Sequence, residues 1–95
     1  MSQVFEREFE VRAPLGLHAR PAGQFVVLAG RFRCEISVGR DSEWVDGRSV
    51  LSLLSLAAAR GTRLRIRAVG EDAAEAVAAL GRHLEETGAG ERDPG

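Results

Sequence analysis

Lysine is absent from this 95-residue sequence, because all thirteen of its basic residues are arginine. Fourteen acidic residues offset them, and the formal net charge is −1. A chain with this balance lacks the overall basic character of nucleic-acid-binding domains, so we expect no nucleic-acid partner. A single cysteine, Cys34, excludes an internal disulfide and is typical of a reducing compartment.

Long apolar runs are missing as well. No segment approaches the length of a membrane span, and the acidic stretch 5–8 does not resemble a signal peptide. We therefore expect a cytoplasmic protein that does not contact a membrane. We place His83 on the polar side of the last helix. The spacing of His18, Cys34 and His83 is not that of metal ligands, so we expect neither a metal site nor a cofactor. No nucleophile elbow or catalytic triad signature is present, which argues against a hydrolase.

The composition is 44% hydrophobic and 28% charged, which is typical of one globular domain of this length. Apolar and polar residues alternate in four segments, which predicts strands over 4–12, 32–38, 43–45 and 63–68. Helical spacing predicts helices over 19–29, with Gly30 as the C-cap, over 50–60 after an N-cap at Ser49, and from 73 onward. We place the domain at 1–86 and expect a flexible tail over 87–95, which has nothing to bury. The element order is βαββαβα.

The most informative segment is Leu15-Gly16-Leu17-His18-Ala19-Arg20-Pro21-Ala22. The glycine gives the backbone freedom before His18, and the proline suits the first turn of a helix. His18 is therefore expected at a helix N-terminus, where unpaired N–H groups favour an anion. Arg20 adds a guanidinium that matches phosphate geometry. A nucleophilic imidazole beside a phosphate cradle predicts that His18 becomes phosphorylated and that Arg20 contacts the phosphate.

Gly-Leu-His-Ala-Arg-Pro-Ala resembles the active-site signature of HPr, the histidine-containing phosphocarrier family of the bacterial phosphotransferase system. The segment 47–56 is similar to the family's second helix, where a basic residue often precedes a regulatory serine, here Arg48 and Ser49. The resemblance covers residues 3–86. It implies an open-faced β-sandwich of the α+β class, with an antiparallel sheet in the order 1-4-2-3 and three helices on one face; periodicity alone leaves this order open. That order places the acidic face of 6–10 beside the arginines of 63–67, which is favourable.

The resemblance implies a phosphoryl relay in which His18 accepts the group from enzyme I and passes it to an EIIA-type protein. In such a relay the chain is a carrier and not a stand-alone enzyme, and we expect a monomer. Two interpretations of Ser49 stay open. It is either a helix cap only, or both a helix cap and a phosphorylation site for an HPr serine kinase/phosphorylase. The second helix is more apolar than one core-facing stripe requires, because Leu53, Leu56 and Ala57 suffice to face the sheet, and an exposed apolar cluster usually marks a docking site. The predicted partner-binding residues are Leu17, Ala19, Arg48, Val50, Leu51 and Leu54.

Two alternatives to a sugar-transport role remain. Sugar-transport members often carry a polar residue where Leu15-Gly16 stands, and the present sequence looks more like the regulatory, nitrogen-type branch. The other alternative is a binding module that regulates a partner through the second helix without phosphoryl turnover. The presence of both His18 and Arg20 argues against that alternative, since such a module would not need them.

Overall fold

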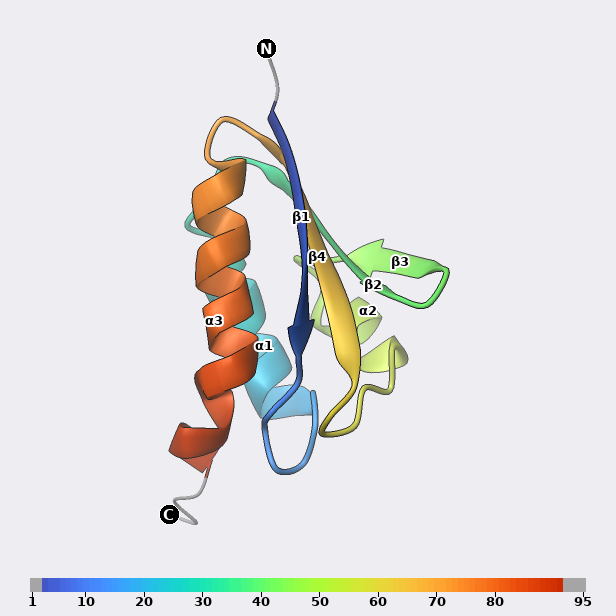
Figure 1. The fold of residues 1–95 in the computed structure, drawn as a ribbon. Helices are drawn as coiled ribbons and strands as arrows, with labels where there is room; N and C mark the ends of the chain where they lie inside the picture. Colours follow the sequence, from blue (N-terminus) through green and yellow to red (C-terminus); the bar gives the residue numbers. More distant parts are fainter. Residues whose placement is uncertain (1–2, 92–95) are drawn as a thin grey trace.

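The computed structural model describes residues 3–91, and the side chains of residues 3–86. Its elements follow the predicted order along the chain (Figure 1). They are β1 (Gln3–Glu10), α1 (Ala19–Ala29), β2 (Glu35–Arg40), β3 (Glu43–Asp46), α2 (Val50–Ser55), β4 (Arg63–Gly70) and α3 (Ala73–Glu91).

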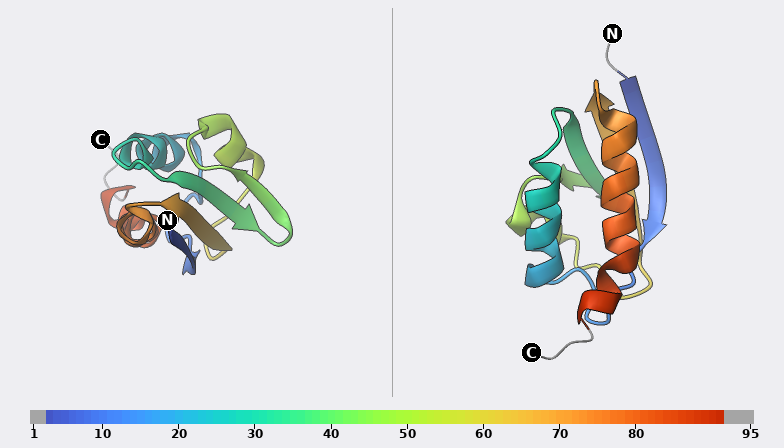
Figure 2. Two further views of the ribbon diagram at one scale, coloured as in Figure 1. Left: turned by 90° about the horizontal axis from the view of Figure 1, so that it is seen from above. Right: turned by 90° about the vertical axis from the view of Figure 1, so that its left-hand side faces the viewer.

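The four strands form one antiparallel sheet in the order β1-β4-β2-β3, so the order implied by the family resemblance is confirmed. Figure 2 shows the helices gathered on one side of this sheet, with α1 between α2 and α3. The other side of the sheet is open. The fold class expected from the sequence is therefore confirmed.

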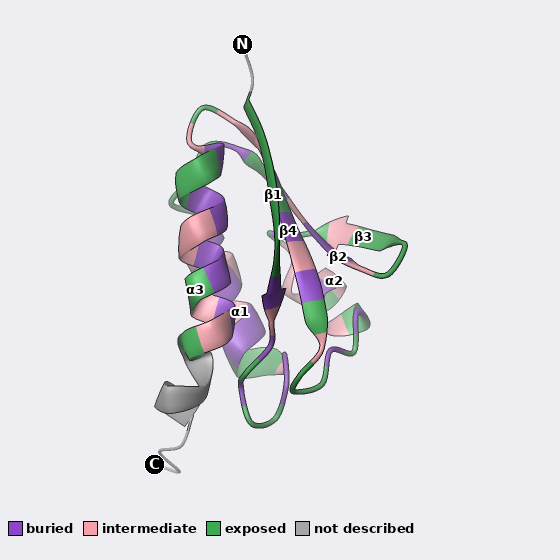
Figure 3. Ribbon diagram, in the orientation of Figure 1, coloured by how far each residue is buried: buried purple, intermediate pink, exposed green. Residues whose placement is uncertain are grey.

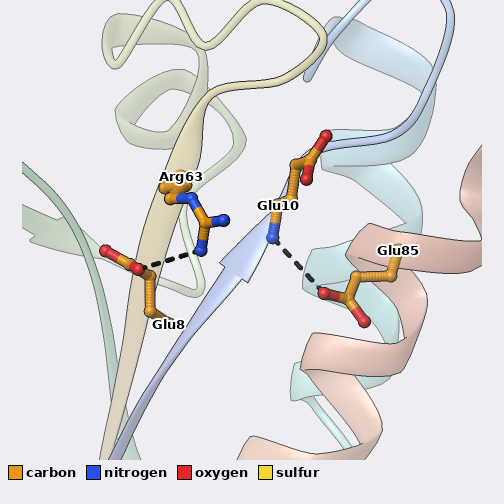
Figure 4. A network of polar contacts seen from close by, with 4 residues as sticks. All are labelled: Glu8, Glu10, Arg63 and Glu85. Atoms are coloured by element: carbon orange, nitrogen blue, oxygen red, sulfur yellow. Dashed lines mark hydrogen bonds and ion pairs between the residues drawn. The ribbon is translucent and has the colours of Figure 1, made fainter.

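Opposite charges face each other on the open side, as predicted. Glu6, Glu8 and Glu10 of β1 lie opposite Arg67, Arg65 and Arg63 of β4. The guanidinium of Arg63 donates to the Glu8 carboxylate at 3.2 Å, a diagonal contact two residues away from the direct partner Arg65 (Figure 4). Both side chains are at least half exposed, so this ion pair contributes little to stability. Figure 4 also shows the Glu10 N–H donating to the Glu85 carboxylate of α3 at 3.4 Å.

The core lies between the sheet and the helices, where buried residues concentrate (Figure 3). The stripe predicted for the last helix is confirmed, because all of its members are buried: Ala73, Ala76, Val77, Leu80 and Leu84. β1 is an edge strand and is less buried than predicted, since Phe9 is its one buried side chain while Phe5 is 40% exposed. The Phe9 ring packs against Gly81, where an added Cβ would lie 2.1 Å from the ring.

Two predicted boundaries differ from the observed ones by three residues or more. α2 ends at Ser55 and not near Arg60, because Ala57 adopts a left-handed conformation with φ +50°. Ala57 is therefore exposed, and Ala58 takes the core position instead. β2 begins at Glu35 and not at residue 32, because the Asp72 carboxylate binds the N–H groups of Arg33 and Cys34.

The last helix includes part of the segment 87–95, for which the expected flexible tail stays a prediction. α3 continues to Glu91, five residues past the position at which we expected the folded domain to end. Residues 92–95 of the predicted tail lie outside the described residues. No helix in the described part of the chain is long and apolar enough to cross a membrane.

Candidate functional site

His18 is the N-cap of α1 and has extended backbone angles, φ −91° and ψ −170°. Its carbonyl accepts the first helical hydrogen bond, from the N–H of Ala22 at 3.0 Å. Its imidazole makes no hydrogen bond to the helix end, so the ring does not serve as a cap. The N–H groups of Ala19 and Arg20 belong to the first turn, which has no helical carbonyl to bond, and Pro21 carries no N–H at all. The imidazole is half-buried and the Arg20 side chain is exposed, so both residues reach the surface at the positive end of α1.

The loop that leads into His18 is fixed by hydrogen bonds to its own backbone and to the segment after α2. The N–H of Gly16 donates to the Ala13 carbonyl at 2.9 Å, and the N–H of Leu17 donates to the Ala58 carbonyl at 2.8 Å. Gly16 has φ +75°, and a Cβ there would lie 2.5 Å from the oxygen of Ala58. Both the backbone angle and the close approach require glycine.

Ser49 is the N-cap of α2, as predicted, and its hydroxyl accepts from the N–H of Ser52 at 3.2 Å. The preceding Arg48 has a structural role that the sequence did not indicate. Its guanidinium donates to the carbonyls of Cys34 at 2.7 Å, Ala29 at 3.1 Å and Phe32 at 2.6 Å. Arg48 therefore ties the end of α1 and the start of β2 to the start of α2. Arg48 is nevertheless exposed, so its predicted place on the docking surface stays a prediction beside this structural role.

The predicted docking residues separate into exposed and buried members. Leu51 is 80% exposed and Ala19 is exposed, whereas Val50 and Leu54 are half-buried and pack against the core. Leu17 is only 5% exposed, which contradicts its predicted place on a docking surface because its side chain belongs to the core.

An apolar groove on α1 was not predicted from the sequence. Val27 of this groove is 69% exposed. The lining residues are Ala19, Arg20, Gly23, Gln24, Val27, Leu28 and Arg31. The signal was present in the sequence, because Ala19, Gly23 and Val27 recur every four residues on the side of α1 opposite its buried stripe. The groove begins at the first turn, next to His18.

The predicted position of His83 on the polar side of α3 was wrong, because His83 lies at the interface between α3 and α1. Its Nε2 lies 3.1 Å from the carbonyl of Pro21, and its ring centroid is 6.2 Å from that of Phe25. The contact joins the middle of α3 to the first turn of α1, so His83 supports the helix that carries His18.

The side chains of Cys34 and Asp72 are hydrogen-bonded to each other, at the end of α1 opposite its first turn. Burial raises the pKa of the Cys34 thiol, and its hydrogen bond to Asp72 acts in the same direction. The N–H of Arg33 donates to the Asp72 carboxylate and holds the pKa of Asp72 below its usual value. Cys34 is thus an unreactive core residue. Among the side chains that the structure describes, no group of three histidine, cysteine, aspartate or glutamate residues could hold a metal ion.

Comparison with known proteins agrees with this arrangement. The family model described as "PTS HPr component phosphorylation site" matches residues 5–86. The phosphocarrier protein HPr of Pseudomonas aeruginosa is 46% identical over 74 residues, which are 77% of this chain and 82% of that protein.

Two solved structures are similar in fold. HPr from Thermoanaerobacter tengcongensis superposes with a TM-score of 0.84 at 34% identity, covering 90% of this chain and 96% of that one. Crh, the catabolite repression protein of Bacillus subtilis, superposes with a TM-score of 0.72 at 39% identity, covering 84% and 92%, and is described as a swapped dimer. The sequence signature, the sheet order and these likenesses together place the chain in the HPr family of phosphocarrier proteins of the phosphotransferase system.

Proposed function

We propose that His18 accepts a phosphoryl group from phosphorylated enzyme I, itself charged by phosphoenolpyruvate, and passes it to a histidine of an EIIA-type protein. The observation that carries the proposal is the position of His18 at the N-cap of α1, with an imidazole that does not cap the helix. The first-turn N–H groups and the exposed Arg20 lie beside it. Positive groups at this place suit the phosphoryl oxygens in both the incoming and the outgoing step.

The transfer requires little covalent chemistry from the chain. The lone pair on one nitrogen of the neutral imidazole attacks phosphorus, and the nitrogen–phosphorus bond of the donor histidine breaks as the new bond forms. The phosphoryl group keeps its transfer potential because it remains on a ring nitrogen. Positioning and charge neutralisation by Arg20 and the partner supply the catalysis.

Docking of the partners is assigned to the exposed apolar residues of α1 and α2. Val27 and Leu51 are each more than two-thirds exposed, and α1 and α2 lie side by side. Relay partners must meet and part quickly, which suits a small interface of less than roughly 1,200 Å² in total.

A nitrogen-type acceptor, rather than one for sugar uptake, is a second candidate, because Leu15-Gly16 stands where sugar-transport members often carry a polar residue. Leu15 is 76% exposed in the loop before His18, where it offers an apolar contact to any partner that reaches the histidine. Phosphorylated protein supplied with purified acceptors of the two kinds would transfer its label preferentially to one of them, and faster transfer to a sugar-specific acceptor would exclude this assignment.

The central experiment is phosphorylation by enzyme I and phosphoenolpyruvate. The protein should gain one phosphoryl group that is labile in acid and stable in base, as a phosphohistidine is. His18→Ala should abolish labelling while leaving the fold and the melting temperature nearly intact, since His18 lies at a helix terminus at the surface. His83→Gln serves as the matched histidine control and should still be labelled. Stoichiometric labelling of the His18→Ala protein would disprove the proposal.

A further inference from the structure

The end of α2 is held by a residue from another part of the chain. Arg40, the last residue of β2, donates from Nη1 to the carbonyl of Leu56 at 2.7 Å and to that of Ala57 at 2.9 Å. These are the carbonyls that the end of the helix leaves without a partner. Hydrogen bonds from a guanidinium are charge-assisted and stronger than neutral ones.

The segment held by Arg40 has a costly backbone conformation. Ala57 lies in the left-handed region with φ +50°, which a residue with a Cβ rarely adopts. Such a conformation persists only where surrounding contacts fix it. The two hydrogen bonds from Arg40 flank the Ala57 peptide, one on each side of its Cα, and are suited to that task.

The next residue, Ala58, carries the constraint to the site. Its carbonyl accepts from the N–H of Leu17, the residue before His18. The same oxygen closes the space above Gly16. The chain of contacts therefore runs from the Arg40 guanidinium through Ala57 and Ala58 to the backbone that presents His18.

We infer that Arg40 is a positioning residue for phosphoryl transfer, because it fixes the left-handed Ala57 and thereby the loop that holds His18. The inference rests on the proposed function for its kinetic consequence. Its structural consequence can be measured without any partner protein. Since a misplacement of about 1 Å can slow a reaction by about a hundredfold, loosening this loop is expected to affect transfer.

The first arm of the test measures amide hydrogen exchange in Arg40→Met by NMR. The Leu17 amide should exchange at least about tenfold faster than in the parent protein, because its acceptor is no longer held by charge-assisted hydrogen bonds. The Ile66 amide, in the central strand β4, reports opening of the whole domain, so the ratio of the two rates isolates the loop. Arg67→Met is the matched control, since Arg67 is an exposed arginine on the open face of the sheet. Equal ratios in the two variants would overturn the inference.

The second arm measures the rate of phosphorylation by enzyme I. Arg40→Met should be slower than Arg67→Met, and Ala57→Gly in the Arg40→Met background should restore both the exchange ratio and the rate, because glycine adopts the left-handed conformation without strain. If Arg40 only stabilised the whole domain, Ala57→Gly would not restore the ratio of the Leu17 and Ile66 exchange rates or the rate of phosphorylation. Faster Leu17 exchange with an unchanged transfer rate would also overturn the inference.

Two further results keep the test decisive. If Arg40→Met does not fold, Arg40→Lys, which retains the charge but not the planar guanidinium, should give intermediate exchange and transfer. If the parent protein is not labelled by enzyme I, the proposed function fails, whereas the Leu17 exchange ratio still tests whether Arg40 holds the loop.

Discussion

Gly16, in the loop before His18, has both a left-handed backbone and a close contact with another segment. Alanine substitutions at Gly16, Gly61 and Gly23 can distinguish the effects of these two features on stability. Gly16 has φ +75° and would place its new Cβ 2.5 Å from the Ala58 oxygen and 2.9 Å from the Ala59 Cα. Gly61 has φ +91°, but a Cβ there would meet nothing within 4 Å. Gly23 lies inside α1 and has neither feature.

The expected effects on stability differ in sign as well as size. Gly61→Ala incurs only the left-handed penalty, about 1–2 kcal/mol, which lowers the melting temperature of a domain of this size by roughly 4–16 °C. Gly16→Ala should lower it further, because the contacted atoms are backbone and cannot turn aside. Gly23→Ala should raise stability by about 0.5–1 kcal/mol, the usual gain inside a helix.

Thermal unfolding followed by circular dichroism checks this ranking, and labelling by enzyme I at a temperature where all three variants are folded checks the site. Gly16→Ala should be labelled more slowly than Gly61→Ala, since only the former displaces the loop directly. If Gly16→Ala melts no lower than Gly61→Ala, the close approach of the loop to Ala58 is not a constraint on the fold, and the reasoning fails.

Three other predictions concern α2, its surface and Asp72. Ser49→Ala should lose about 1 kcal/mol of stability because the helix cap is missing, and it should still be labelled normally. Ser49→Asp should keep its melting temperature but be labelled more slowly, because its charge lies beside the docking surface. Equal labelling rates for Ser49→Asp and the parent protein would show that Ser49 is only a helix cap. Leu51→Glu should slow labelling with little effect on unfolding, while Val4→Glu, which changes another exposed apolar residue, should leave labelling unchanged; unfolding of Leu51→Glu would show that this side chain is core. The folded-state pKa of Asp72 is lowered, so its stabilising effect is present above the ordinary pKa of 3.8 and is lost as the pH falls through the lower folded value. Melting curves of Asp72→Asn should consequently depend less on pH in that range than those of the parent, and identical pH profiles would contradict the assignment.

Much of the fold could be predicted because each element carries a local signal. The family resemblance implied that β1 pairs with β4, and the alternation of glutamates and arginines supported this pairing. The buried stripe of α3 was predicted from its helical spacing. The end of α2 could not be predicted, because nothing in its local sequence departs from a helix former before Gly61. It is set by Arg40, a residue sixteen positions away from Leu56 along the chain.

The candidate site divides in the same way. His18 and Arg20 could be found because glycine and proline mark the start of a helix next to them. The roles of Arg48 and His83 could not, since both depend on carbonyls that only the folded chain brings within reach. Leu17 was assigned to the surface because the motif gives no sign that the loop turns its side chain inward.

The strand order has a consequence for the synthesis of the protein. β4 is the last strand to leave the ribosome, yet it lies between β1 and β2. Until it emerges, β1 has no strand to pair with, and the sheet cannot close. The loop of His18 is also incomplete until then, because the N–H of Val11 donates to the carbonyl of Thr62 and that of Arg12 to the carbonyl of Leu84. Although His18 precedes β4 and α3 along the chain, we expect the nascent domain to become a substrate for a phosphoryl donor only after both of these elements have been made.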